Sequence, residues 1–519
     1  MSSALSSPFM AESVAEVVPD IAKVAGRLAQ SSVITGRRRV RLVPQSGQSY
    51  TSGNSAGVVN ILIQDGQAYA DLLSAVVSFN LLVWDSNNTA GASSLVCCDD
   101  GAYSVFRRCL VSVNSTLMDD TDMLAKKVNA ELYATASQDW YNSVGSFMGL
   151  WKYNTTIYGE APANASAQTT LIGKYNVSAK VPLISGRQED NTTNTGAGVP
   201  AIAGQNRYAI PISLLSSFFR NDTLFPSRNA GQLYLQLNLA SAVEALFTSQ
   251  SGATNAPIPN FTISNLTLEI DYVDLHPTYL EMMDGLIESP SGEGVSWAFD
   301  AHLVATQNIN AGSGQQSVVV SKASQNLRSL QVLIQPQAGM SSGTYFAQSC
   351  FNNPGLIDIQ YRIGSLYYPA FTAVGENRAY MDLQNAFGSP ESIDKCGLVD
   401  ANNYYLYTPT TATLSAPACS RNNAGTFTAL VASTNASTIL PKAINHQFSD
   451  MFMYAYCFDR LKHAKYHGID LDGVNTLTSA GSQMVVQLNA NEQEASVLVS
   501  IVRFTRILKL GGGATSVIG

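Results

Sequence analysis

Short segments in which apolar and polar residues alternate recur along almost the whole chain. Such alternation has the two-residue period of a β-strand that buries one face. Strands are expected at residues 57–63, 75–85, 233–239, 261–275, 295–305, 317–322, 327–335, 356–368, 483–490 and 496–510. Polar loops rich in Gly, Pro and Asn separate them, and the few short helices include 119–133 and 376–388. This pattern predicts an all-β protein made of antiparallel sandwiches.

The chain divides near its midpoint. The segment ISNLTLEIDYVDLHPTYLEMM (263–283) indicates a long strand whose alternation slips once, followed by a helix that begins at Pro277. Leu268, Ile270 and Tyr272 are expected to face a core. Strands begin again at VSWAFDAHLVA, after the loop ESPSGEG. Residues 263–283 therefore close one β-sandwich, and a second begins after them.

The two halves resemble each other. Near its end, each half has a strand ending in Gln-Leu-Asn, in QLYLQLNLASAVEAL and in SQMVVQLNANEQEAS. Each of these strands is followed by an acidic turn and a long final strand. The sequence therefore predicts an arm over residues 1–36, a first sandwich over 37–287, and a second sandwich with a C-terminal tail over 288–519.

Residues 1–36 differ from the rest of the chain. Apolar residues at helical spacing are followed by a cluster of arginines. The residues that define the predicted assembly arm are Val14, Val18, Ile21 and Leu28, with Arg37, Arg38, Arg39 and Arg41 directly after residue 36. Two interpretations stay open: a mobile terminus with a solvated charge run, or an arm that binds a neighbour.

Composition narrows the class of protein. Charged residues make up only 13% of the chain, and the net charge is −8. So few charges favour a surface that is mostly subunit interface, although a secreted β-protein would look similar. No signal peptide is visible, and no run of about eighteen apolar residues could cross a bilayer. The chain is expected to act inside a cell, with its seven cysteines reduced.

Motifs for catalysis are weak. GNSAG around Ser55 resembles a nucleophile elbow, but a strand rather than a helix follows it. His463 and His467 have helical metal-pair spacing without an obvious third ligand. Asp99–Asp100 and Asp119–Asp120 are expected to form a turn and a helix N-terminus. We therefore expect no enzyme, and no catalytic, cofactor-binding or metal-binding residues.

Four stretches together resemble one protein family. They are DDGAYSVFRRCLVSVNSTLMDD, LFPSRNAGQLYLQLNLA with FTISNLTLEIDYVDLHPTYLEMM, DIQYRIGSLYYPAF, and GIDLDGVNTLTSAGSQMVVQLNAN. In order and spacing they are similar to the double jelly-roll major capsid proteins of tailless icosahedral DNA viruses, of the polinton-like virus and virophage type. The resemblance covers about residues 38–510.

The resemblance implies two tandem eight-stranded antiparallel jelly rolls and a structural role. Three copies would form a pseudo-hexagonal capsomer of an icosahedral virion, assembled inside the host cell. The flanks of the sandwiches and the loops 186–206 and 400–426 would make the trimer contacts. Implied partners are neighbouring capsomers, penton proteins and minor capsid proteins. Residues 14–28 and the arginines would form an assembly arm that meets packaged DNA or an internal membrane.

Two other classes of protein fit part of the pattern. One is a two-domain β-sandwich carbohydrate-binding protein or glycosidase, for which an aromatic groove with paired acids is not evident. The other is a tandem jelly-roll coat protein of a small RNA virus, against which size and the strand-to-helix passage at 275–283 argue. The mass of the purified protein separates a trimer from a monomeric lectin.

Overall fold

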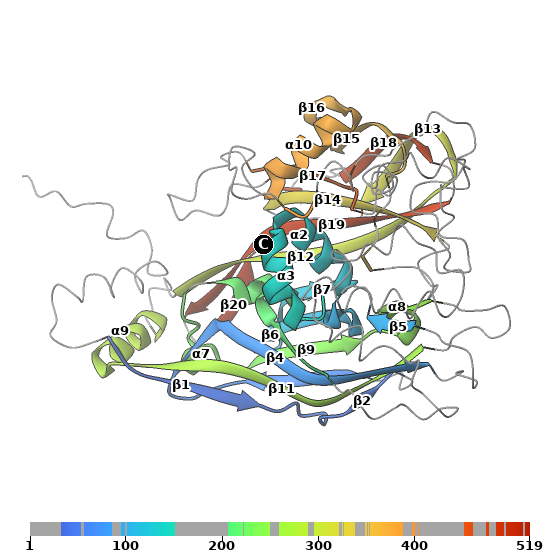
Figure 1. The fold of residues 1–519 in the computed structure, drawn as a ribbon. Helices are drawn as coiled ribbons and strands as arrows, with labels where there is room; N and C mark the ends of the chain where they lie inside the picture. The colour runs from blue at the N-terminus through green and yellow to red at the C-terminus, as the bar shows by residue number, and fades with distance from the viewer. Residues whose placement is uncertain are drawn as a thin grey trace, which may run out of the picture.

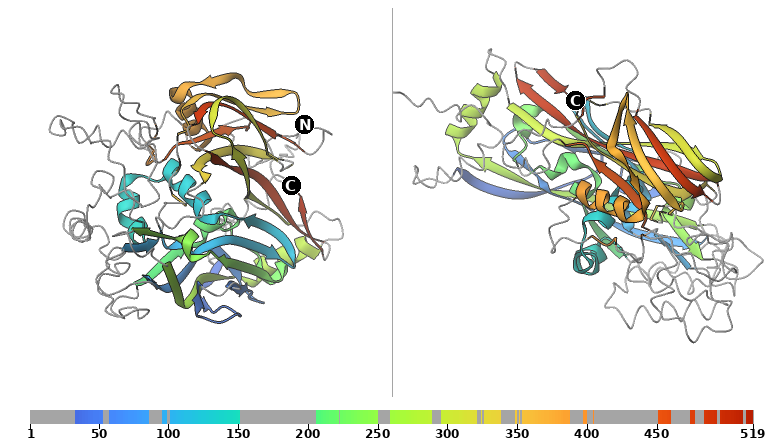
Figure 2. Two further views of the ribbon diagram at one scale, coloured as in Figure 1. Left: turned by 90° about the vertical axis from the view of Figure 1, so that its right-hand side faces the viewer. Right: turned by 90° about the horizontal axis from the view of Figure 1, so that it is seen from above.

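The computed structural model describes four main stretches of the chain, 33–150, 206–288, 295–387 and 451–518, each with gaps, of which 460–473 is the longest, and a few residues near 397–404. Figure 1 shows two β-sandwiches, built from the first and second halves of the sequence, with helices lying between them. Figure 2 shows the same arrangement from the side and from above.

The first sandwich consists of two antiparallel sheets. Its five-stranded sheet contains, in spatial order, β1 (Ile34–Leu42), β11 (Pro259–Leu275), β4 (Tyr69–Asp85) and β8 (Asn206–Pro211), with β2 (Tyr50–Thr51) also paired to β11. Its four-stranded sheet contains β3 (Val58–Ile63), β9 (Leu233–Leu239), β6 (Phe106–Val113) and β7 (Thr116–Thr121). A separate ribbon pairs β5 (Leu95–Cys98) with β10 (Leu246–Ser249).

The second sandwich has the same plan. Its five-stranded sheet contains, in spatial order, β12 (Val295–Ile309), β19 (Ser496–Gly511), β14 (Leu327–Pro336) and β17 (Met453–Cys457), with β20 (Ala514–Ile518) also paired to β19. Its four-stranded sheet contains β13 (Gly312–Val320), β18 (Met484–Glu492), β15 (Leu356–Ile363) and β16 (Leu366–Val374).

Strand order is identical in the two sandwiches. When β2, β5, β10 and β20 are set aside, each sandwich has eight strands along the chain. In both, one sheet holds the first, eighth, third and sixth strands, and the other holds the second, seventh, fourth and fifth. The two Gln-Leu-Asn strands, β9 and β18, are the seventh strand of their sandwich. The prediction of two similar β-sandwiches is confirmed.

Helices are short and few in the described part of the chain. One follows the fifth strand of each sandwich: α2 (Leu124–Thr135) after β7, and α10 (Gly375–Phe387) after β16. The others lie in the first half: α3 (Gln138–Phe147), α6 (Ile212–Leu215), α7 (Ser227–Ala230), α8 (Ala242–Ala245), α9 (Pro277–Glu288), and the 3-10 helices η2 (Ala102–Val105) and η6 (Ser217–Arg220).

The slip predicted in the 263–283 strand is a bulge. The register of β11 against β4 shifts between Ser264 and Thr267. After the shift, Leu268, Ile270 and Tyr272 alternate inward and are fully buried, as the sequence predicted. The helix α9 begins at Pro277, which needs no N–H donor at that position.

The predicted bounds of two elements were wrong. Residues 119–121 belong to strand β7 instead of a helix N-terminus, because Asp120 pairs across the sheet with Arg108 on β6. The helix α2 begins only at Leu124. The expected strand 356–368 is a hairpin, because Gly364, with φ +60°, turns the chain between β15 and β16.

Candidate functional site

The helix α2 lies between the two sandwiches and joins them (Figure 1). All its residues except Glu131 and Thr135 are buried. Lys126 Nζ donates a hydrogen bond to Gln335 Oε1 of β14 at 2.5 Å. Tyr133 Oη donates to the backbone oxygen of Ser349 at 3.0 Å. A helix of the first sandwich thus bonds directly to the second.

Aromatic side chains make the apolar part of this junction. Phe218 in η6 packs against Phe299 on β12, with ring centroids 4.9 Å apart and nearly perpendicular planes. Phe225 packs in the same edge-on manner against Trp297, at 5.4 Å. Edge-to-face pairs of this kind add to the area that the rings bury. The two halves therefore share one continuous hydrophobic core.

Charged groups lie beside these rings, with Lys127 buried and Glu131 and Arg220 partly buried. Glu131 accepts hydrogen bonds from both ends of the Arg220 guanidinium, the Nη2–Oε2 distance being 2.7 Å. Lys127 Nζ lies 3.1 Å from Glu131 Oε2 and is only 2% exposed. Burial lowers the pKa of Lys127. Burial would raise the pKa of Glu131, but Arg220 and Lys127 outweigh it and hold that pKa well below its usual range.

Asp119 and His302 bring two distant segments together at the same junction. Asp119 accepts hydrogen bonds from the Ser216 hydroxyl and, at 3.3 Å, from the backbone N–H of His302. Burial raises the pKa of Asp119 despite these donors. Burial, and then the positive charge of Lys127, lower the pKa of His302 well below its usual value. His302 is therefore neutral in the folded protein at neutral pH.

This burial predicts a pH dependence of stability. The folded pKa of His302 lies below its unfolded value of about 6.5. The unfolded chain therefore takes up this proton first, and between about pH 6.5 and its folded pKa His302 lowers the free energy of unfolding by about 1.4 kcal/mol for each pH unit of acidification. His302→Gln should remove this slope between pH 6.5 and 5, measured by urea unfolding at several pH values. His276→Gln, at a partly exposed site before α9, is the control. A His302→Gln slope equal to wild type contradicts the assignment.

The four arginines predicted to belong to an assembly arm lie in strand β1. Arg37 Nη2 and Arg39 Nε donate to the two oxygens of Asp271 on β11, at 2.6 and 2.8 Å. Hydrogen bonds from Arg39, and also from Arg37, lower the pKa of Asp271. Arg38 and Arg41 pair with Asp65 and Glu269. These arginines thus belong to the first sandwich, and carboxylates of the same chain already offset their charge.

The other residues of the predicted arm, Val14, Val18, Ile21 and Leu28, lie outside the described residues. Ser55, His463, His467 and the Asp99–Asp100 pair also lie outside them, as do almost all of the loops 186–206 and 400–426. The role of the arm in assembly stays a prediction.

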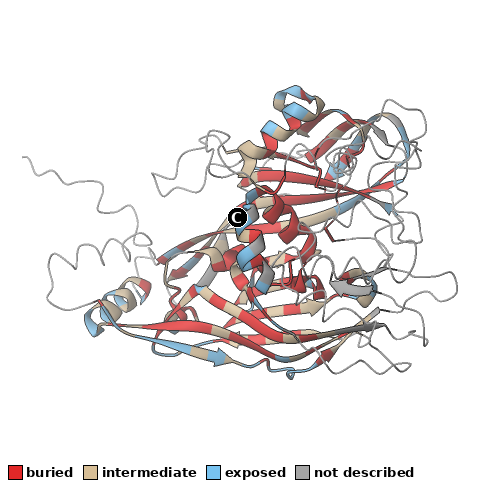
Figure 3. Cartoon of the chain, viewed as in Figure 1, coloured by how far each residue is buried: buried red, intermediate tan, exposed pale blue. Residues whose placement is uncertain are grey.

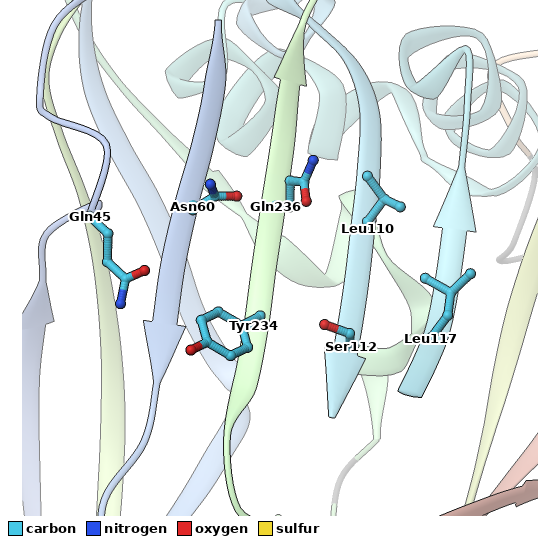
Figure 4. Close-up of a pocket in the computed structure, with 7 residues that line it drawn as sticks. All are labelled: Gln45, Asn60, Leu110, Ser112, Leu117, Tyr234 and Gln236. Carbon is cyan, nitrogen blue, oxygen red and sulfur yellow. The ribbon is translucent and has the colours of Figure 1, made fainter. Parts of the chain in front are cut away.

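A hollow of about 300 Å³ lies on the outer face of the first sandwich's four-stranded sheet (Figure 4). The residues that line it are Gln45, Asn60, Leu110, Ser112, Leu117, Tyr234 and Gln236. The lining holds amides, hydroxyls and leucines, with no carboxylate, histidine or cysteine. It offers a polar contact surface without groups for acid–base or nucleophilic chemistry.

Groups suited to catalysis or metal binding are lacking where the structure describes the chain. No cluster of three or more His, Cys, Asp or Glu among those residues could hold a metal ion. Burial raises the pKa of the Cys109 thiol, which disfavours the nucleophilic thiolate. Within the same residues, no helix is long and apolar enough to cross a membrane.

Comparison with solved structures shows the fold. No protein-family model and no curated protein matches the sequence. A chain of the Sputnik virophage, solved by cryo-electron microscopy, matches 94% of this chain and 89% of its own length, with a TM-score of 0.53 and 9% identity. The faustovirus major capsid protein matches 92% of this chain and 90% of its own, with a TM-score of 0.50 and 11% identity.

The chain has a double jelly-roll fold. The identical strand order of the two eight-stranded sandwiches and the match over nearly the whole chain agree on this point. At the junction between the two jelly rolls the chain buries the charged and polar side chains of Asp119, Lys126, Lys127 and His302. At such low identity the likeness establishes the architecture alone.

Sequence reasoning missed the junction. Asp119, Glu131, Arg220 and His302 come from four separate segments, and no local motif connects them. One signal was present: Lys126 and Lys127 interrupt the apolar face of a helix that is otherwise rich in Leu, Val and Ala. Buried lysines need partners, so such a helix indicates contact with polar groups from elsewhere in the fold.

Proposed function

We propose that this chain is the major capsid protein of an icosahedral DNA virus, with a structural role and no enzymatic one. The observation that carries the proposal is the duplicated jelly roll, which the chain shares over nearly its full length with the faustovirus major capsid protein. Two similar sandwiches in one chain let three copies supply six similar units to a pseudo-hexagonal capsomer. The low charge content fits extensive contacts between copies.

The proposal includes the partners and places implied by this role. Copies would contact each other within a trimer and neighbouring capsomers in the virion shell. Penton and minor capsid proteins would complete that shell. We also propose the division into an arm over 1–36, a first jelly roll over 37–287 and a second over 288–519. The strand β1 begins at Ile34, so the part of the arm available for DNA or a membrane lies before it.

The test is the mass of the purified protein, followed by its assembly. We expect light scattering to give about three times the 55.4 kDa of one chain, because an obligate interface of more than about 2,000 Å² keeps the copies together at micromolar concentration. A chain lacking residues 1–30 should keep this mass but fail to form closed particles in electron microscopy.

The outcomes separate the parts of the proposal. A one-chain mass at every concentration contradicts the capsomer and favours a monomeric carbohydrate-binding protein. If the shortened chain forms salt-stable shells as efficiently as the full chain, the arm has no role in assembly, and the capsomer proposal is unaffected.

A further inference from the structure

The helices α2 and α10 are counterparts in the two jelly rolls. Each follows the fifth strand of its sandwich. Counted from its first residue, each has a cation at the fourth position and a carboxylate at the eighth, Lys127 with Glu131 in α2 and Arg378 with Asp382 in α10. Both pairs form an ion pair at 3.1 Å. A leucine follows each carboxylate.

The surroundings of these two helices differ. The Lys127 side chain is 2% exposed, whereas that of Arg378 is 57% exposed. At the seventh position Ala130 is fully buried, whereas Met381 is 43% exposed. In Figure 3 α2 lies inside the molecule and α10 at its edge.

The strand that precedes α10, β16, is also exposed to solvent. The strand β7, which is the counterpart of β16, contacts β12 of the second jelly roll. The strand β16 instead has several large apolar side chains in solvent. We call the exposed side of β16 and α10 the β16–α10 surface. Its exposed residues are Leu366, Tyr367, Phe371, Val374, Arg378 and Met381. Phe371 is 87% exposed, which is unusual for a phenylalanine.

The five-stranded sheet of the second jelly roll covers α2 and β7. On β12, His302 contacts Ser217 and Asp119 of the first jelly roll. Arg506 on β19 donates to the backbone oxygens of Leu117 and Met118 on β7, at 3.1 and 2.7 Å. The strand β7 is at the edge of its sheet, so its outward carbonyl groups need such donors.

The corresponding sheet of the first jelly roll is exposed. A charge cluster spans three strands of each five-stranded sheet. In the second jelly roll this cluster is Asp300 on β12, Arg503 on β19 and Arg328 on β14. In the first jelly roll it is Arg37 on β1, Asp271 on β11 and Asp71 on β4. Arg503 and Arg328 are 34% and 24% exposed, whereas Arg37 is 58% exposed.

We call the exposed side of this first sheet the β1–β11–β4 face. It is defined by Arg37, Arg39, Arg41, Asp71 and Leu73, the last being 50% exposed. In Figure 1 this sheet lies at the opposite end of the molecule from α10 and β16, so the two surfaces cannot meet within one chain.

We propose that the β16–α10 surface of one copy binds the β1–β11–β4 face of a second copy. Inside one chain, α2 and β7 contact the sheet that contains β12 and β19. The proposed contact between two chains has the same arrangement, with α10 and β16 against the sheet that contains β1 and β11. The arginines of β1 would donate to the edge carbonyls of β16, as Arg506 does to β7. The two surfaces differ, so the contact is head-to-tail, and in the proposed trimer three such contacts would close a ring. This inference rests on the proposed function and names the trimer contact.

Two exposed substitutions test the contact separately. Met381→Glu places a charge on the β16–α10 surface, and Leu73→Glu places one on the β1–β11–β4 face. Met282→Glu, at a 50% exposed methionine on α9, is the matched control. Light scattering should give a three-chain mass for wild type and the control, and a one-chain mass for each of the two variants.

Mixing the two variants gives the sharper result. Each Met381→Glu copy keeps an intact β1–β11–β4 face, and each Leu73→Glu copy keeps an intact β16–α10 surface. An equimolar mixture should therefore form a two-chain complex and stop there, because a ring needs every contact. Circular dichroism checks that each variant is folded, and Phe371→Ser replaces Met381→Glu if the latter does not fold.

Three outcomes overturn the inference or what it rests on. A three-chain mass for folded Met381→Glu or for folded Leu73→Glu shows that the copies meet elsewhere, and the proposed capsid function stands. Variants that stay monomeric when mixed show that the two surfaces do not bind each other. A one-chain mass for the wild type instead contradicts the proposed function.

Discussion

Ile270→Asp is expected to abolish the soluble folded protein. Ile270 is fully buried on β11, where it is paired with Val40 of β1 at the centre of the first sandwich. The substitution loses the apolar contacts of isoleucine, about 2–5 kcal/mol for a large-to-small change, and buries an unpaired carboxylate at a further cost of several kcal/mol. Since domains are stable by about 5–15 kcal/mol, little stability remains. The measurement is the soluble yield and the mass of the soluble fraction.

The control at the same position is Ile270→Val. It removes one methylene group and should cost about 0.5–1.5 kcal/mol, which leaves the protein folded. A soluble Ile270→Asp protein with the wild-type mass would show that the inward side of β11 has been assigned wrongly.

Arg220→Met should destabilise the junction by about 3–5 kcal/mol, measured by urea unfolding. The methionine fills similar space but leaves the Glu131 carboxylate with Lys127 as its remaining charged partner, in a site where burial opposes charge. Because α2 connects the jelly rolls, the loss should weaken the contact between them. The double variant Arg220→Met with Glu131→Gln should not recover the loss, because Lys127, whose side chain is 2% exposed, then loses the carboxylate with which it pairs.

The matched control for this prediction is Arg107→Met. Arg107 also forms an ion pair with a glutamate, Glu244, but its side chain is 48% exposed. Exposed pairs contribute at most about 1 kcal/mol. Equal destabilisation by Arg220→Met and Arg107→Met would mean that the junction pair has no special role.

The local sequence determined most of the strands. In β11, alternation fixed which side chains face inward, and the slip in that alternation marked the bulge before Thr267. In α10, Gly388 and Pro390 beyond the last residue marked where the helix ends. These features depend on neighbours within a few residues, so the sequence shows them directly.

The error at residues 119–133 has a different cause. Two aspartates before an apolar helical pattern are typical of a helix N-terminus. Here Asp120 lies on a strand because Arg108, on the neighbouring strand, offers it a partner. Hydrogen bonding across the sheet therefore outweighed the local preference, and the neighbouring strand was not evident from the residues around 119.

Only the tertiary structure decided which similar segments are buried. The helices α2 and α10 have matching charges and spacing, yet Lys127 is buried and Arg378 is exposed. The difference comes from what packs on each helix: the second jelly roll covers α2, whereas the described residues of the chain leave the β16–α10 surface exposed. Likewise the arginines of β1 were visible in the sequence, but their carboxylate partner Asp271 is more than two hundred residues away. Burial and long-range pairing depend on distant segments, and the local pattern does not contain them.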